Sequence, residues 1–169
     1  CLSVRVFGDR LVYNCHHCQI DGIIPFEETK RGHMHNLEEH KVKKVDHQPL
    51  TDSAISWLER RGISLETAIK TKLYSTNHWI ASEQSKVDCI GYPYFENGVE
   101  RGSKIRSLGT KGFSCTTALR LFFNIDNVDL DDSLVICEGE MDALSMIESG
   151  IDSAVSVPNG AVQKLSDGS

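Results

Sequence analysis

Three carboxylates lie within five residues of the sequence, in the motif Glu138-Gly139-Glu140-Met141-Asp142. The apolar run 133–137 before the motif predicts a short buried strand, and the apolar spacing after it predicts a helix that ends at Gly150. In an open parallel sheet, ligands bind at the carboxyl ends of strands, where a glycine lets the backbone approach a phosphate. Carboxylates in such a place can bind Mg²⁺ or act as a general base on an attacking hydroxyl. The purely structural alternative is that Glu140 and Asp142 stabilise the positive N-terminus of the helix.

Basic residues precede this acidic motif. Segment 101–111 contains four Lys or Arg residues and no acid, whereas segment 126–152 contains nine acids and no Lys or Arg. Lys104 and Arg106 alternate along a predicted strand and suit phosphate oxygens, the first as a point charge and the second as a planar fork. An exposed strand face without a ligand is the alternative interpretation. The charge pattern favours phosphate on one side of a site and metal ions on the other.

A second motif, Cys15-x-x-Cys18, can place two sulfurs on one zinc ion. A structural zinc ion needs four ligands, so the second pair would have to come from upstream of Cys1, or include Cys1 itself. A redox pair and unpaired buried thiols are the alternatives. The segments 3–7 and 10–14 predict a hairpin that leads directly into the motif, and this favours zinc. His16 and His17 are expected to be exposed rather than to bind the metal.

Composition sets the limits for these sites. The 169 residues, 40% hydrophobic and 25% charged, are typical of one globular core with a small appendage. Six cysteines are too few for a disulfide scaffold and fit a reducing compartment, and the net charge of −6 argues against a protein that simply coats nucleic acid. No apolar run is long enough to cross a bilayer and no secretion signal opens the chain, so no membrane association is expected.

The elements that must position the motifs follow from local signals. Residues 1–26 are predicted to form a partial, β-rich zinc ribbon, 27–48 a polar linker, and 49–169 an α/β domain with a parallel sheet, cut at its C-terminal end. A helix capped by Thr51 or Asp52 is expected to stop at Gly62, and another to start at Ser64. Asn97-Gly98 predicts a tight hairpin turn, and 133–157 a βαβ unit. The residues expected in the core are Trp57, Leu58, Phe122, Phe123, Cys89, Cys115 and Cys137, and Trp79 is assigned there in preference to a base-stacking surface.

The ordered set of motifs resembles a known family. The apolar strand, Glu-Gly-x-x-Asp and amphipathic helix are similar to the TOPRIM domain of primases, topoisomerases and related nucleases. Four further segments occur in the order found in bacteriophage primase-helicases and their mitochondrial relative Twinkle, so that the resemblance spans residues 13–161: Tyr13 to Cys18 with Gly22, Tyr92 to Gly98, Lys104 to Arg106, and Pro158 to Gly160.

This resemblance implies a DNA primase that makes short RNA primers from ribonucleoside triphosphates on a single-stranded DNA template, with Mg²⁺ or Mn²⁺ as the catalytic metal. It assigns Glu138 as the catalytic glutamate, and Glu140 and Asp142 to the acidic cluster, with Glu138 and Asp142 as magnesium ligands. Lys104 and Arg106 would contact nucleotide phosphates, while Cys15 and Cys18 would hold Zn²⁺ in a ribbon that helps to read the template. A fused helicase and a replicative DNA polymerase are the expected partners. The expected location is the cytoplasm of a bacterial host for a phage protein, or the mitochondrion for a Twinkle-like one.

Two features of the family are not found in the sequence. An Asp-x-Asp pair would be expected after Ser169, and a first cysteine pair before Cys1. We therefore expect a fragment of a primase-helicase that is inactive alone. The rival hypotheses are a non-catalytic TOPRIM module that binds DNA or loads a helicase, and a TOPRIM nuclease, which would not need an upstream ribbon.

Overall fold

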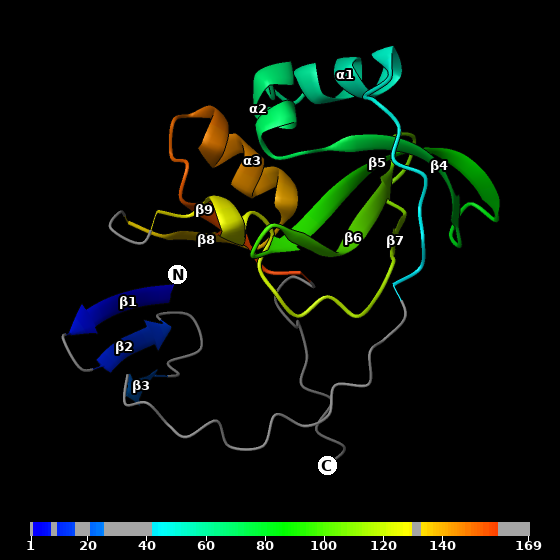
Figure 1. Cartoon of the computed structure of the whole chain (residues 1–169). Helices are drawn as coiled ribbons and strands as arrows, with labels where there is room; N and C mark the ends of the chain where they lie inside the picture. The colour runs from blue at the N-terminus through cyan, green and yellow to red at the C-terminus, as the bar shows by residue number, and fades with distance from the viewer. Residues whose placement is uncertain (1, 8–9, 16–20, 26–41, 130–132, 159–169) are drawn as a thin grey trace. The chain divides into compact units, whose positions relative to one another are not determined.

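The computed structural model describes residues 2–7, 10–15, 21–25, 42–129 and 133–158 (Figure 1). The chain divides into two compact units, Cys1–Glu39 and His40–Ser169. The first unit contains an antiparallel sheet of strands β1 (Leu2–Phe7), β2 (Arg10–Cys15) and β3 (Asp21–Pro25), in that order. Phe7 pairs with Arg10, which confirms the predicted hairpin, and β2 ends at Cys15. Cys18 lies outside the described residues, as does most of the linker, so the zinc ribbon stays a prediction.

The second unit opens with two short helices that begin where the sequence predicts, and the first ends three residues before the predicted stop at Gly62. In α1 (Asp52–Glu59) the Thr51 hydroxyl accepts a hydrogen bond from the amide of Ala54 at 3.3 Å, and Gly62, with φ at 74°, follows its last turn. In α2 (Leu65–Lys70) the Ser64 hydroxyl accepts from the amide of Thr67 at 3.2 Å. Such caps satisfy amide groups that lack a partner inside the helix.

A four-stranded antiparallel sheet follows, in the order β4 (Tyr74–Ile80), β5 (Ser85–Glu96), β6 (Val99–Ser107), β7 (Phe113–Cys115). Asn97 and Gly98 both have positive φ between β5 and β6, which confirms the predicted hairpin turn. Trp79 is 54% exposed, so its assignment to the core is wrong. Successive side chains of a strand point to opposite faces, and in β4 the buried neighbour is Ile80.

The βαβ unit is confirmed. Strand β8 (Val135–Cys137) runs parallel to β9 (Ala154–Ser156), and α3 (Glu140–Glu148) connects them and ends before Gly150, whose φ is 90°. Strand β9 is fully buried, but Ile136 in β8 is 39% exposed. The expectation that β8 is buried on both faces is therefore wrong, because in the described part of the chain it pairs only with β9.

One core holds the sheet and the βαβ unit together. Phe123 pairs with Ser156 of β9 through backbone hydrogen bonds, and the Asn124 side chain donates to the carbonyls of Asp152 and Ala154. A short 3₁₀ helix, Ile125–Asn127, follows. Figure 1 shows α3 in orange beside β8 and β9, with α1 and α2 close to the sheet. The large buried side chains of this core come from α1, the segments on either side of α2, β5, the segment before the 3₁₀ helix, and α3: Trp57, Leu58, Ile63, Leu73, Ile90, Tyr92, Tyr94, Leu119, Phe123 and Leu144.

Of the remaining residues that the sequence analysis expects in the core, some are buried and others are not. Cys89 is buried as expected, whereas Cys115, Cys137 and Phe122 are only partly buried. At the end of the predicted linker, the His47 ring stacks on Tyr74 with 3.7 Å between ring centroids, and Gln48 forms a bridge to Ser75. Among the described residues, no helix has the length and apolar character needed to cross a membrane.

A glycine in β5 provides a test of this packing. Gly91 pairs with Tyr74, and a Cβ atom added at Gly91 would overlap the Tyr74 ring. We expect Gly91→Ala to lower the free energy of unfolding by about 3 kcal/mol, since a packed core cannot accept an extra carbon without a backbone shift. Urea denaturation followed by tryptophan fluorescence measures the change. The matched control is Gly109→Ala, where the nearest heavy atom to an added Cβ is 3.7 Å away. Equal stability of the two variants would contradict the proposed close packing.

Candidate functional site

A cleft of about 300 Å³ brings together three of the predicted site residues, the cations Lys104 and Arg106 and the acid Glu140. Strand register explains the arrangement, because Lys104 of β6 pairs with Tyr92 of β5, and Arg106 of β6 pairs with Phe113 of β7. Side chains of paired residues share one face of a sheet. The turn before α3 provides the opposite wall. The lining residues are Tyr92, Lys104, Arg106, Lys111, Phe113, Gly139 and Glu140.

At the centre of the cleft is an ion pair between Lys104 and Glu140. The Lys104 ammonium donates to both carboxylate oxygens, at 2.9 and 3.1 Å, and to the carbonyl of Pro158 at 3.2 Å. The two side chains are only 16% and 8% exposed. The pair thus fixes a cation at one position and connects β6 to the first turn of α3.

Tyr94 completes this cluster. Its hydroxyl donates to Glu140 Oε1 at 2.5 Å. Burial, and then the negative charge of Glu140, raise the pKa of Tyr94 far above its ordinary value, so the phenol keeps its proton and remains a donor. Glu140 oxygens therefore bind protein donors. This favours a role for Glu140 in positioning Lys104 over a role as a metal ligand.

Two further cations in the cleft have no acidic partner among the described residues. The Nε atom of Arg106 is buried without a hydrogen-bond partner, and Lys111 is exposed. The Arg106 guanidinium lies 5.5 Å from the Trp57 ring centroid, and that of Arg61 lies 3.5 Å from the same ring. Burial, and then the nearby charge of Arg106, lower the pKa of Arg61. An excess of positive charge therefore lines the cleft, which suits a phosphate group.

The other two predicted acids lie on either side of Gly139, which lines the cleft. Glu138 and Asp142 are exposed, and neither forms an ion pair or hydrogen bond within the described part of the chain. Gly139 is the N-cap of α3, and a Cβ atom there would approach Asp142 Oδ2 to 3.3 Å. Within the same part of the chain, no group of three or more His, Cys, Asp or Glu is arranged to hold a metal ion. Any metal site here would need oxygen ligands beyond these two carboxylates.

Sequence reasoning missed the roles of Tyr94, which binds Glu140, and of Phe113, which lines the cleft. Tyr94 is invisible to it because its role depends on a contact with a helix 46 residues further along the chain. Phe113 could have been found, since it lies two residues after Lys111 of the basic segment, and surfaces that bind single-stranded nucleic acid combine cations with aromatic rings. Cys15 and Cys18, the predicted zinc ligands, cannot be compared, because their side chains lie outside the described part of the structure.

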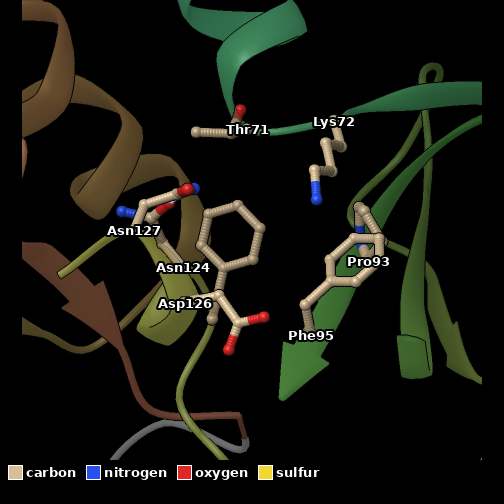
Figure 2. Close-up of a pocket in the computed structure, with 8 residues that line it drawn as sticks. Thr71, Lys72, Pro93, Phe95, Asn124, Asp126 and Asn127 are labelled. Atoms are coloured by element: carbon tan, nitrogen blue, oxygen red, sulfur yellow. Dashed lines mark hydrogen bonds between the residues drawn. The ribbon is translucent and has the colours of Figure 1, made fainter. Parts of the chain in front are cut away.

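A second pocket, shown in Figure 2, has a structural role. Its volume is about 10 Å³, roughly enough for a single water molecule. The Lys72 ammonium lies 4.0 Å from the centroid of the Phe95 ring, and the Asp126 carboxylate accepts from the amides of Asn97 and Gly98 at 2.9 and 2.7 Å. The Asp126 contacts hold the β5–β6 turn, so the substrate site is better assigned to the larger cleft.

Comparison with curated proteins gives two relatives in Arabidopsis thaliana. The chain is 30% identical over 125 residues to the Twinkle homolog protein, chloroplastic/mitochondrial, a match that covers 74% of this chain and 17% of the relative. It is 27% identical over 128 residues to the primase homolog protein, covering 74% of this chain and 35% of the relative. The chain thus spans about a third or less of each relative's length. No family model matches the sequence.

Solved structures show the same relationship at the level of the fold. A structure of the DnaG primase catalytic domain bound to ssDNA matches with a TM-score of 0.50 and 20% identity, covering 64% of this chain and 49% of that one. A structure of the DnaG catalytic core matches with a TM-score of 0.50 and 21% identity, covering 64% and 48%. The mixed α/β fold, with its parallel strand pair, therefore resembles that of the DnaG primase core. Sequence and fold agree, and the chain contains a domain of the TOPRIM primase and Twinkle type.

Proposed function

We propose that this chain provides the nucleotide-phosphate cleft of a DNA primase, which makes RNA primers on single-stranded DNA during replication. The observation that carries the proposal is the cleft itself, where cations of β6 and the loop after it face the turn between β8 and α3. The relationship to primase and Twinkle-type proteins supports the same function at the level of the family.

In the proposed reaction a primer 3′-hydroxyl attacks the α-phosphate of a ribonucleoside triphosphate. A phosphodiester bond forms while the bond to the β-phosphate breaks, so pyrophosphate leaves and the hydroxyl proton passes to solvent. Arg106 and Lys111, which have no acidic partner in the described structure, bind the phosphate oxygens, and Lys104 is held in place by Glu140. Negative charge develops on the phosphate oxygens in the transition state. Cations that are already held in position lower the activation barrier because they do not have to reorganise during the reaction.

The carboxylates of Glu138 and Asp142 are suitable oxygen ligands for a divalent metal ion. Both are exposed carboxylates without a partner among the described residues, and Mg²⁺ is commonly bound by one or two carboxylates together with substrate phosphates. We propose that they hold Mg²⁺ or Mn²⁺, which would neutralise charge on the phosphate oxygens.

We also propose a domain organisation for the whole chain. Residues 1–26 would form part of a zinc ribbon with Cys15 and Cys18 as ligands, 27–48 a linker, and 49–169 the catalytic domain. This assignment rests on motif spacing and on the resemblance. The proposed partners in the whole protein are a template strand, ribonucleoside triphosphates, a fused helicase and a replicative polymerase. We propose an organelle as the location, rather than the cytoplasm of a phage host, because the Twinkle homolog is named as chloroplastic/mitochondrial.

A second candidate is a non-catalytic TOPRIM module that binds DNA or loads a helicase. One observation favours it: among the described residues no three potential ligands surround a metal position, and Glu140 binds Lys104. Such a module would keep the cationic cleft and bind nucleic acid without joining nucleotides.

Nucleotide binding tests the phosphate site. We expect Arg106→Ala to weaken binding of fluorescently labelled ATP by the 169-residue chain roughly 10- to 100-fold, because a charged hydrogen bond contributes about 1.5–3 kcal/mol. Fluorescence anisotropy measures the affinity. The matched control is Arg101→Ala, since Arg101 lies on the same strand but pairs with Glu96 outside the cleft, at 3.2 Å. Equal losses in the two variants would argue against a phosphate site in the cleft.

A further inference from the structure

An exposed aromatic ring stands beside the cationic cleft. Phe113 of β7 is 61% exposed, and strand β7 is at the edge of the four-stranded sheet. Its pairing with Arg106 places the two side chains on one face, and the Lys104 ammonium lies 5.2 Å from the ring centroid. A large apolar ring in this position gains little from the protein core, because it is mostly in solvent.

Phe113 is also shared between two hollows of the surface. On one side is the cleft of about 300 Å³, and on the other is an open hollow of about 580 Å³. Lys111 lines both as well. The second hollow is otherwise formed by the β4–β5 turn and the loop before β7, and its only described carboxylate, Glu83, accepts a hydrogen bond from the Thr110 hydroxyl at 2.7 Å. The remaining residues of the second hollow are Ala81, Ser82 and Gly112.

The exposed Phe113 ring and the cations beside it suit different parts of a nucleotide. Arg106 and Lys111 offer positive charge to phosphates, while the neighbouring ring offers a flat apolar surface to a base. Proteins that bind single strands combine these two features, because every base has a face that can stack and the backbone is uniformly negative. Two adjoining hollows with a common cation and a common ring suit a ligand longer than one nucleotide.

We propose that Phe113 is a base-stacking residue for a single nucleic-acid strand that passes from the cleft, over β7, into the second hollow. The inference rests on the proposed function, since it takes the cleft as the phosphate site, and it adds the route of the strand and the residue that holds a base.

The experiment measures anisotropy of a labelled eight-nucleotide oligo(dT) with the 169-residue chain. We expect Phe113→Ala to weaken binding about 5- to 150-fold, the range for loss of one base stack, and Phe113→Tyr to retain most of the affinity. Phe113→Ala should leave the salt dependence of binding unchanged, whereas Arg106→Ala should reduce its slope by about 0.7, the value for one phosphate contact on a single strand. An oligomer of the same length without bases should bind equally to the wild type and to Phe113→Ala.

Four outcomes decide whether the assignment stands. Trp79→Ala removes another exposed aromatic residue, 54% exposed, that lines neither hollow, and an equal loss there would overturn the assignment. An equal loss of ATP affinity in Phe113→Ala would place the ring against a free nucleotide and overturn the strand route. If Arg106→Ala weakens oligo(dT) binding while Phe113→Ala does not, the stacking inference fails and the phosphate cleft stands. If wild type does not bind oligo(dT) at all, the stacking inference fails, and the ATP measurement alone then decides whether the phosphate cleft stands.

Discussion

Replacing Glu140 with alanine is expected to lower the free energy of unfolding by about 3–5 kcal/mol, which is the typical cost of removing one partner of a buried ion pair. The substitution leaves the Lys104 ammonium, only 16% exposed, without its carboxylate, and removes the acceptor of the Tyr94 hydroxyl. Urea denaturation at pH 7 measures the change.

An exposed ion pair provides the matched control. Lys70 and Asp152 lie 2.6 Å apart, but their side chains are 45% and 56% exposed, so Asp152→Ala should cost less than about 1 kcal/mol. The double variant Lys104→Met/Glu140→Met should be more stable than Glu140→Ala, because it removes both buried charges together. A loss below about 1 kcal/mol in Glu140→Ala would contradict a buried, structurally important pair, and the positioning role of Glu140 would fall with it.

Elements defined by short-range signals could be predicted from the sequence. Thr51 and Ser64 cap their helices through contacts three residues away, and Asn97-Gly98 forms the turn of adjacent strands. The βαβ unit also follows from local apolar spacing. Each of these signals acts within one short stretch of the sequence, so tertiary contacts only reinforce it.

Burial of particular faces could not be predicted as well. Alternation along a strand shows that two faces differ, but not which of them faces the core, and Trp79 was assigned to the wrong one. A continuous apolar run suggested a strand covered on both sides, yet Ile136 is 39% exposed, because coverage depends on which neighbours a strand has. These are properties of the assembled sheet.

In the candidate site, too, some features could be predicted from the sequence and others depend on tertiary contacts. Charge pattern placed Lys104, Arg106 and Glu140 in one predicted site, and the structure brings these three to one cleft. What the sequence could not give is the pairing within that cleft: Glu140 binds Lys104, 36 residues away, while Glu138 and Asp142 stay exposed. The three acids therefore differ in role, and only a tertiary contact separates them.

This difference leads to the expectation that Glu138→Gln abolishes primer synthesis without affecting folding. In the protein expressed from its complete reading frame, ribonucleotide incorporation on single-stranded DNA should fall by about 100-fold or more, the range for loss of a group that acts directly on the reacting atoms. The side chain is exposed and has no partner within the described structure, so the stability of the variant should equal that of wild type. Incorporation of labelled ribonucleotides measures the activity.

Glu66→Gln is the matched control, because Glu66 is an exposed acid in the first turn of α2, away from the cleft. It should leave incorporation unchanged. Equal incorporation by Glu138→Gln and wild type would remove the catalytic assignment of this residue. If the wild-type protein binds single-stranded DNA through Arg106 but incorporates no ribonucleotide with either Mg²⁺ or Mn²⁺, the cleft is a nucleic-acid-binding surface and the non-catalytic module is the correct function, because the phosphate site would then act without the exposed carboxylates beside it.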